Sequence, residues 1–243
     1  MRIDVYLTEK KLVKSRTAAQ SLINIGGVYV NGRMAQKSSM DVTEADVVTI
    51  EEIKLPKYVG RGGLKLEGAL NHFRLNISGA VCVDIGASTG GFTDCMLQSG
   101  AEKVFAVDVG RGQLNEKLRK DPRVISLEQT DIRDFDFDEY PAGADFIGAD
   151  VSFISLKLVL PEIWRLLKTG CCAVTLIKPQ FEAGRAALNK RGIVTDKRTR
   201  EFVVNELLCF AEQCGFTVAG VTESPITGGD GNTEYLMYII KDR

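Results

Sequence analysis

Four charged residues lie where apolar segments of the sequence begin or end. Lys178 ends the strand-like run TLIK just before a proline, and Asp150 ends the run FIGAD. Glu234 begins the run EYLMYII, and Lys65 lies in the helical stretch RGGLKLEGALNHF. An unpaired buried charge is costly, but two acids and two bases can pair. We therefore interpret these four residues as one buried cluster.

This cluster has a structural and a catalytic interpretation. In the structural interpretation, the four charges only pair with one another and stabilise the fold. As a catalytic site, it would hold one lysine neutral, because a second ammonium nearby and partial shielding from water both disfavour the charged form. Asp150 and Glu234 would orient that lysine. A neutral amine in such a place can take the proton of an attacking hydroxyl group.

A glycine-rich loop lies in VDIGASTGGFTD, between a strand-like segment that ends in Asp84 and a helical stretch. Glycines allow a backbone to approach a ligand closely, and a helix start exposes amide groups. The loop has Ser88 where a dinucleotide fingerprint needs its third-position glycine, and no Gly-Lys-Ser or Gly-Lys-Thr follows. It is more similar to the D-x-G-x-x-x-G loop of S-adenosylmethionine-dependent methyltransferases.

Two more acids follow the next strand-like runs. Asp108 ends KVFAVD, 24 residues after Asp84, and suits a carboxylate that binds ribose hydroxyls. Asp131 follows the third run, in QTDIRD, and is predicted to meet the edge of an adenine ring. Each acid alone could instead cap a loop or the following helix. Three acids at one edge of a sheet favour a nucleoside site.

The elements that position these residues alternate between strands and helices from residue 80 onward. Five buried strands are predicted, in AVCVDIG, KVFAVDVG, VISLEQTD, ADFIGADVS and CAVTLIKPQ, and they indicate a mostly parallel, doubly wound sheet. FTVAGVTES and EYLMYII, joined by PITGGDGN, predict a terminal antiparallel hairpin. The fold class is therefore α/β and Rossmann-like, with ligands beyond the carboxyl ends of the strands.

A small α+β module precedes this fold. Leu7 and Leu12 are assigned to a first short helix, and Ser15 is predicted to cap a second, RTAAQSLINI, which stops at Gly26-Gly27. VYVNG is a strand that turns at Asn31-Gly32, and DVVTIEE is a second alternating strand. Because such a unit has little core, we predict that it binds a partner and carries no chemistry.

The two modules differ in charge. The linker KLPKYVGRGG predicts domains at 1–58 and 59–243, with 59–79 as the linker and leading helix of the second. Residues 1–65 hold 11 Lys+Arg and 7 Asp+Glu, a net charge of +4, whereas residues 66–243 hold 20 and 25, a net charge of −5. Surface scatter could produce this difference, and a basic front module also suits an anionic partner.

The composition is that of an ordinary globular protein, with 44% hydrophobic and 26% charged residues. No segment approaches the roughly 20 apolar residues of a membrane span, and the first residues lack the apolar core of a signal peptide. Six cysteines in apolar stretches, without a C-x-x-C pair, predict buried reduced thiols. His72 is the single histidine, so Ser-His and Cys-His catalysis are disfavoured. We expect a cytoplasmic protein with no metal site and no membrane partner.

The first module resembles the S-four-type RNA-binding domain, named after a ribosomal protein. RIDVYL, SRTAAQSLINIGGVYVNG and QKSSMDVTEADVVTI carry this likeness over about 50 residues. The resemblance implies that the face with the second helix and the next turn meets the RNA backbone. It would place five residues near phosphates, although each alone could be a solvated surface charge: Lys11, Lys14, Arg16, Arg33 and Lys37.

The second module and its charged cluster are similar to FtsJ-like ribose 2′-O-methyltransferases, and the whole chain resembles the TlyA group, once labelled haemolysins. The likeness rests on YVGRGGLKL, DIGASTGGFTD, ADVSFISL, LIKPQFE and GNTEYL. It implies that Lys65, Asp150, Lys178 and Glu234 form a catalytic tetrad with Lys178 as the base. It also implies S-adenosylmethionine as the cofactor, no metal, and a binding set of Asp84, Gly86, Ala87, Ser88, Gly90, Gly91, Phe92, Thr93, Asp108, Asp131, Ile132 and Asp150.

The resemblance further implies an activity, because TlyA-type enzymes methylate the ribose 2′-hydroxyl of cytidine in ribosomal RNA. Ribosomal RNA or ribosomal subunits are then the expected partner, with large-subunit RNA favoured because the chain resembles the shorter members; a monomer is expected. Two other functions stay open. The tetrad and loop argue against a nonenzymatic RNA-binding assembly factor, and the lack of apolar spans argues against a membrane-active haemolysin.

Overall fold

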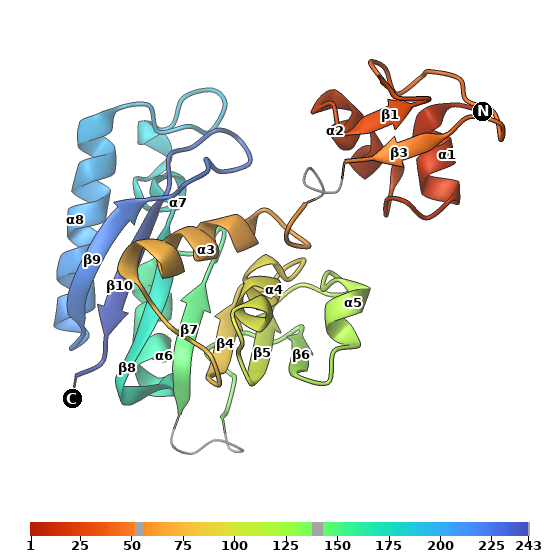
Figure 1. The fold of residues 1–243 in the computed structure, drawn as a ribbon. Helices are drawn as coiled ribbons and strands as arrows, with labels where there is room; N and C mark the ends of the chain where they lie inside the picture. Colours follow the sequence, from red (N-terminus) through yellow and green to blue (C-terminus); the bar gives the residue numbers. More distant parts are fainter. Residues whose placement is uncertain (52–55, 138–142, 243) are drawn as a thin grey trace. The chain divides into compact units, whose positions relative to one another are not determined.

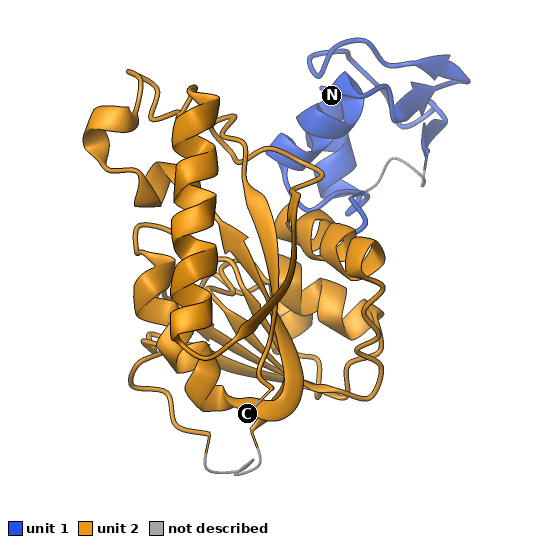
Figure 2. Ribbon diagram, turned by 90° about the vertical axis from the view of Figure 1, so that its left-hand side faces the viewer, with its two compact units in different colours: residues 1–57 blue, residues 58–243 orange. Residues whose placement is uncertain are grey.

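The computed structural model describes residues 1–51, 56–137 and 143–242. The chain forms two compact units, Met1–Lys57 and Tyr58–Arg243, shown in blue and orange in Figure 2. Each unit has a hydrophobic core of its own. They are described separately below.

The first unit begins with two helices, α1 (Ile3–Glu9) and α2 (Arg16–Asn24). The predicted cap is confirmed, because the Ser15 hydroxyl accepts a hydrogen bond from the Ala18 amide at 3.2 Å. Leu7 is fully buried, but Leu12 is 43% exposed and lies beyond α1, so its assignment to that helix was wrong. The helix ends before Leu12 because the chain turns through Lys11, which has a positive φ.

Three short strands complete this unit: β1 (Val28–Val30), β2 (Arg33–Met34) and β3 (Val48–Ile50), in the order β2-β1-β3. The predicted turn is confirmed. Asn31 and Gly32 both have positive φ, as a two-residue hairpin turn requires. Strand β2 was not predicted, because it has two exposed residues and therefore no apolar alternation.

The second unit contains a seven-stranded sheet in the order β6-β5-β4-β7-β8-β10-β9 (Figure 1). Strands β4 to β8 run parallel, and β9 and β10 form an antiparallel hairpin, so the predicted fold class is confirmed. All five residues of VCVDI in β4 are buried, as expected where helices cover both faces of a sheet. The strands are β4 (Val81–Ile85), β5 (Lys103–Asp108), β6 (Val124–Glu128), β7 (Ala144–Ala149), β8 (Leu167–Ile177), β9 (Thr217–Glu223) and β10 (Tyr235–Ile240).

Helices pack on both faces of this sheet (Figure 1). On one face, α3 (Gly62–Phe73) and α4 (Gly91–Gln98) share a core with β4, β5, β7 and β8. On the other face, α6 (Leu156–Leu166) and α8 (Lys197–Gln213) form a second core. Among the described residues, the segments that connect these elements include α5 (Glu116–Arg119), α7 (Pro179–Glu182) and a 3-10 turn at Arg185–Ala187.

The strand order reverses between β4 and β7. From β4 the chain moves outward to β5 and β6, and then returns to β7 on the other side of β4. Ligands bind at such a reversal, beyond the carboxyl ends of the strands. Because β10 runs antiparallel, its first residue lies at this same edge: Tyr235 of β10 pairs with Ile177 of β8. Glu234 and Lys178 therefore lie next to each other at the ends of neighbouring strands.

The cysteine prediction was only partly right. Cys82 and Cys95 are buried and all six cysteines are free, but Cys209 is exposed on α8. Its neighbours Leu207 and Ala211 face the core, and Cys209 lies on the opposite side of the helix. An apolar surrounding sequence therefore does not decide the burial of a helical residue.

Candidate active site

The four charged residues predicted to cluster do so. The Lys65 amine lies 2.6 Å from Glu234 Oε2 and 4.0 Å from Asp150 Oδ2, while Asp150 Oδ1 lies 2.6 Å from the Lys178 amine. The charges thus form an alternating row, Glu234, Lys65, Asp150 and Lys178. Burial is deep, with 9% exposure for Lys178, 7% for Lys65 and 2% for Glu234. Each charge has an opposite neighbour, which makes its burial tolerable.

Glu234 is bound differently from the prediction. It was expected to orient the base lysine, but its Oε2 accepts from Lys65, and its Oε1 accepts from the Gln180 amide at 3.0 Å. Gly228 closes over the same carboxylate, since a Cβ there would lie 2.5 Å from Oε1. Gln180 and Gly228 were missed by sequence reasoning, because only the fold brings them to Glu234.

Lys178 has a different environment from Lys65. Its amine donates to the Ser152 hydroxyl at 2.8 Å and lies 5.8 Å from the centre of the Phe181 ring. Lys178 precedes α7, whose first residue is a proline, a favoured residue at that position. Lys65 therefore faces two carboxylates, whereas Lys178 faces one carboxylate and a neutral hydroxyl.

The glycine loop is packed tightly against its surroundings. Gly86 has φ +80°, and a Cβ on it would lie 2.7 Å from the carbonyl oxygen of Asp150, so glycine is required there. A Cβ on Gly91 would lie 2.9 Å from the Gly63 amide, and one on Gly90 would overlap Leu118. The loop amides are also used internally, since those of Gly86 and Ala87 donate to Val107. The glycines thus provide space for packing within the loop.

Asp84 lies beneath this loop and is fully buried. Its Oδ2 accepts from the amide and the hydroxyl of Thr93, at 2.8 and 2.6 Å, in the first turn of α4. Its Oδ1 has no hydrogen-bond partner among the described residues. Burial raises the pKa of Asp84 to about 7, against the opposing effect of Thr93. Asp84 and Thr93 fasten the loop to the helix, and their role in cofactor binding stays a prediction.

Asp84 gives the fold a measurable pH dependence. Its pKa exceeds the ordinary value of 3.8, so the folded chain keeps a proton that the unfolded chain releases between about pH 4 and pH 7. The free energy of unfolding therefore falls as pH rises through this window, by at most about 1.4 kcal/mol per unit. We expect Asp84→Asn, which cannot ionise, to remove this contribution. Urea unfolding followed by fluorescence of Trp164, the single tryptophan, measures it; equal pH slopes in both proteins would contradict it.

Asp108 connects the glycine loop to the next strand. Its Oδ2 accepts from the Ser88 amide at 2.7 Å and its Oδ1 from the Gly110 amide at 2.6 Å. The side chain is half-buried, and each carboxylate oxygen can accept a further hydrogen bond. Asp108 therefore shapes the loop and keeps acceptor capacity for the hydroxyls of a ligand.

Asp131 and Ile132 follow strand β6, and their contact with the cofactor stays a prediction. Both carboxylate oxygens of Asp131 are bound by the guanidinium of Arg133, at 2.9 and 2.6 Å, which lowers the pKa of Asp131 to about 2. Ile132 is buried in the core. Neither residue lines the hollow beside the glycine loop, so the structure does not bring them to the tetrad.

A hollow of about 170 Å³ joins the glycine loop to the tetrad. Its walls include Gly62, Thr89 and Ser152, which were not predicted, and the base candidate Lys178. Loop glycines give it backbone walls, and a carboxylate inside it attracts a cation. This chemistry fits the cationic S-adenosylmethionine. Six of the predicted cofactor residues line it: Gly86, Ala87, Ser88, Gly91, Phe92 and Asp150.

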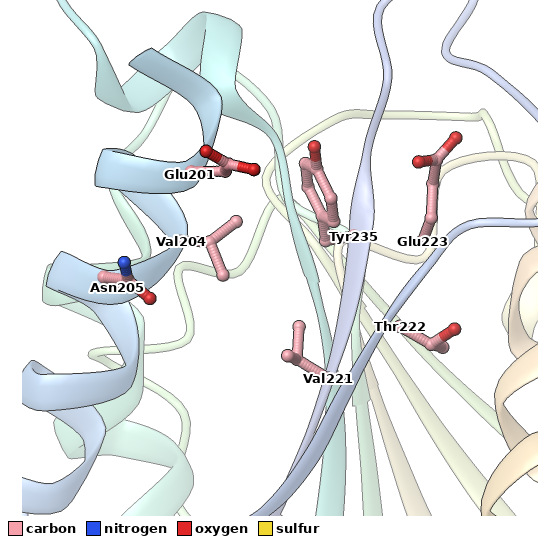
Figure 3. A pocket seen from close by; sticks show the side chains of 7 residues that line it. All are labelled: Glu201, Val204, Asn205, Val221, Thr222, Glu223 and Tyr235. Carbon is pink, nitrogen blue, oxygen red and sulfur yellow. The ribbon is translucent and has the colours of Figure 1, made fainter. Parts of the chain in front are cut away.

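A larger hollow of about 340 Å³ lies elsewhere in this unit. Figure 3 shows its lining, with Glu201, Val204 and Asn205 on α8 and with Val221, Thr222, Glu223 and Tyr235 on β9 and β10. It contains neither tetrad residues nor loop residues. Volume therefore does not identify the reactive site of this unit.

An exposed aromatic side chain adjoins Lys178 and was also missed. Phe153 is 90% exposed, and its ring centre lies 4.9 Å from that of Phe181. Its φ of +63° is uncommon for a bulky residue and marks backbone strain. A sequence cannot reveal this exposure, because Phe153 sits in an apolar stretch that looks like core.

The predicted RNA-contacting residues of the first unit are all exposed. Arg16 is partly engaged, since it binds Oδ2 of the buried Asp4 at 3.1 Å. Asp4 also binds Arg2 and Gln20, and these hydrogen bonds lower its pKa. The other four form no ion pair among the described residues: Lys11, Lys14, Arg33 and Lys37.

The fold and site together define a Rossmann-like methyltransferase. Residues 58–241 match the FtsJ-like methyltransferase family, and residues 1–48 match the S4 domain. The chain belongs to the FtsJ-like methyltransferase family and carries an S4 domain before it.

Full-length relatives place the chain with the TlyA-type members. Hemolysin A of Brachyspira hyodysenteriae is 43% identical over 99% of this chain and 100% of its own length. The 16S/23S rRNA (cytidine-2′-O)-methyltransferase TlyA of Mycobacterium tuberculosis is 39% identical, covering 98% of this chain and 89% of the relative. A solved structure from Streptococcus thermophilus, named as a hemolysin, superposes with a TM-score of 0.76 at 42% identity, covering 99% of this chain and 88% of that one.

In the described part of the chain, no helix combines the length and the apolar character needed to cross a membrane.

Proposed function

We propose that this protein transfers a methyl group from S-adenosylmethionine to the ribose 2′-hydroxyl of cytidine in ribosomal RNA. The observation that carries the proposal is the row Glu234, Lys65, Asp150 and Lys178, which ends at the hollow beside the glycine loop. The name of the Mycobacterium tuberculosis relative supplies the nucleotide and the class of RNA.

The cofactor would lie in the hollow lined by Gly86, Ala87, Ser88, Gly91 and Phe92. When bound, S-adenosylmethionine supplies an electrophilic methyl group on a sulfonium. Asp108 would accept from the ribose hydroxyls through its remaining lone pairs. Phe92 and the loop backbone would exclude water from the reacting atoms.

Lys178 is the better candidate for the base. Lys65 faces two carboxylates, and each stabilises its charged form. Lys178 faces one carboxylate and the neutral Ser152, so losing its proton costs less electrostatic stabilisation. As a neutral amine, Lys178 would take the proton of the attacking 2′-hydroxyl at Nζ. Asp150 would then stabilise the resulting ammonium.

RNA binding would involve both the S4 domain and the rim of the hollow. The exposed cations of the first unit suit phosphates, whose neutralisation releases counterions. The exposed ring of Phe153 beside Phe181 offers a surface on which a nucleobase can stack. An exposed phenylalanine that contacts the ring beside the base candidate is hard to explain for a small soluble acceptor.

Removing the carboxylate of Asp108 should weaken cofactor binding. We expect Asp108→Ala to cost about 1–3 kcal/mol in affinity for S-adenosylmethionine, because the ribose hydroxyls lose an acceptor. Asp145→Ala is a matched control, since Asp145 also binds a backbone amide but lies at the start of β7, on the opposite edge of the sheet. Isothermal calorimetry on both variants tests this. Unchanged affinity in Asp108→Ala would remove this residue from the site.

Neutralising two exposed cations of the S4 domain should weaken RNA binding uniformly. Arg33→Gln with Lys37→Gln should lower affinity for ribosomal RNA and reduce the salt slope of log K by about 0.7–0.9 per lost contact. Affinity for S-adenosylmethionine should stay the same. Filter binding across a salt series measures both effects. An unchanged slope would show that these two residues do not meet phosphates.

The decisive assay transfers a labelled methyl group to purified small and large ribosomal subunits and to their extracted RNA. We expect 2′-O-methylcytidine after nuclease digestion and mass spectrometry, and none with Lys178→Ala. A methylated base, or cofactor binding without transfer to any RNA, would overturn the proposal and favour an assembly factor. The preference for large-subunit RNA stays a prediction, and comparing methyl transfer to the small and to the large ribosomal subunit tests it. The cytoplasmic location and the monomeric state also stay predictions.

A further inference from the structure

We propose that Ser152 is a positioning residue that fixes the direction of the Lys178 amine. This inference rests on the proposed function, because it concerns the lysine assigned as the base. Ser152 follows Asp150 by two residues and was not among the predicted site residues. It lines the same hollow as Asp150 and Lys178.

Three groups surround the Lys178 amine. Asp150 Oδ1 lies 2.6 Å away, the Ser152 hydroxyl accepts a hydrogen bond at 2.8 Å, and the Phe181 ring centre lies 5.8 Å away. The side that remains opens on the hollow, whose walls include Gly62 and Phe92. The position of the amine is therefore determined by contacts from the loop after β7 and from α7.

A neutral lysine amine has two N–H bonds and one lone pair. The Ser152 hydroxyl accepts a hydrogen bond from the amine at 2.8 Å, whereas Asp150 Oδ1 lies 2.6 Å away as an ion-pair partner outside hydrogen-bond geometry. Ser152 is therefore the group that fixes the rotation of the amine and leaves its lone pair free to face the hollow. Without Ser152, one N–H bond could rotate into the hollow in place of the lone pair. A general base must present its lone pair to the proton that it removes.

The chemical type of Ser152 matters for this role. A second carboxylate would hold the amine equally well, but it would also stabilise the charged form. A hydroxyl accepts the hydrogen bond without adding negative charge. The site contains both arrangements: Lys65 faces two carboxylates, those of Glu234 and Asp150, whereas Lys178 faces one carboxylate and one hydroxyl.

The backbone next to Ser152 supports a role in function over one in stability. Ser152 is exposed, and its neighbour Phe153 has the uncommon φ of +63°. Strain of this kind persists where the surrounding structure maintains it, often at active sites. An exposed serine with one hydrogen bond contributes little to folding, so its loss should affect the reaction more than the stability.

The test compares Ser152→Ala and Ser152→Thr with the control Ser99→Ala, whose serine lies at the far end of α4 from the glycine loop. Single-turnover methyl transfer to ribosomal subunits gives the rate, and titrations give the affinities for cofactor and RNA. We expect Ser152→Ala to be roughly tenfold slower, with both affinities and Tm unchanged, because one hydrogen bond to the base is lost. Ser152→Thr keeps the hydroxyl and should restore most of the rate. A wild-type rate in Ser152→Ala would overturn the proposal, as would equal losses in the alanine and threonine variants.

A second arm is independent of methyl transfer. Acetylation of Lys178 by acetic anhydride, followed by mass spectrometry of its peptide, reports how firmly the amine is held. We expect labelling in Ser152→Ala to be several-fold faster than in the wild type and in Ser99→Ala, because the released amine reaches solvent. If wild-type protein methylated no RNA but this difference appeared, the proposed function would fall and the placement of the amine would stand. Equal labelling in all three proteins would overturn the role of Ser152.

Discussion

Lys178→Arg is expected to abolish methyl transfer while leaving cofactor and RNA affinity intact. A guanidinium keeps its proton at all accessible pH and cannot act as a base, although it can still pair with Asp150. The loss should reach roughly 10²- to 10⁴-fold, the usual contribution of a positioned base. Single-turnover assays at saturating substrate, with calorimetry for the cofactor, measure both parts of this prediction.

A structural lysine predicts a different result for this variant. Arginine would then keep the ion pair with Asp150, and activity would largely survive. Near-normal transfer by Lys178→Arg would end the assignment of Lys178 as the base.

Gly228→Ala should lower the transfer rate by roughly 10- to 100-fold, since small displacements in an active site are costly. A Cβ at this position would lie 2.5 Å from Glu234 Oε1, a carboxylate that Lys65 and Gln180 fix in place. The carboxylate must move, and Lys65 then loses its closest partner. The disturbance should pass along the row to Asp150 and Lys178.

The neighbouring glycine provides the matched control. A Cβ on Gly229 would meet nothing within 4 Å, so Gly229→Ala changes the same loop without touching Glu234. We expect this variant to keep wild-type rates and cofactor affinity. If both alanine variants were equally slow, loop flexibility would explain the loss and Glu234 would not. If both variants were fully active, methyl transfer would not depend on the observed position of the Glu234 carboxylate.

The architecture of the second unit was predictable because its signals are local. Five apolar runs separated by helical stretches indicate a parallel sheet, and the carboxyl ends of such strands meet at one edge. Asp150 and Lys178 end two of these runs, so their proximity followed from the strand pattern. The register then places Glu234 beside them, because Tyr235 pairs with Ile177.

Other features depend on contacts between distant residues. The pairing of Arg16 with Asp4, the bond from Gln180 to Glu234 and the closure of Gly228 over that acid are set by tertiary packing. Gly90 is a further example. Its lack of a side chain makes room for Leu118, whereas the sequence suggested only that the loop glycines make room for a ligand.

Strand β10 enters the sheet between β8 and β9, although β9 precedes it in the chain. Glu234, just before β10, also follows Lys65, Asp150 and Lys178 in the sequence, so it leaves the ribosome after them during synthesis. A nascent chain that stops before Glu234 leaves β8 and β9 without the strand that lies between them, and unpaired strand edges of this kind promote aggregation. It also lacks the acid that neutralises Lys65. Insertion of β10 thus joins β8 to β9 and brings Glu234 to the charge row in the same step.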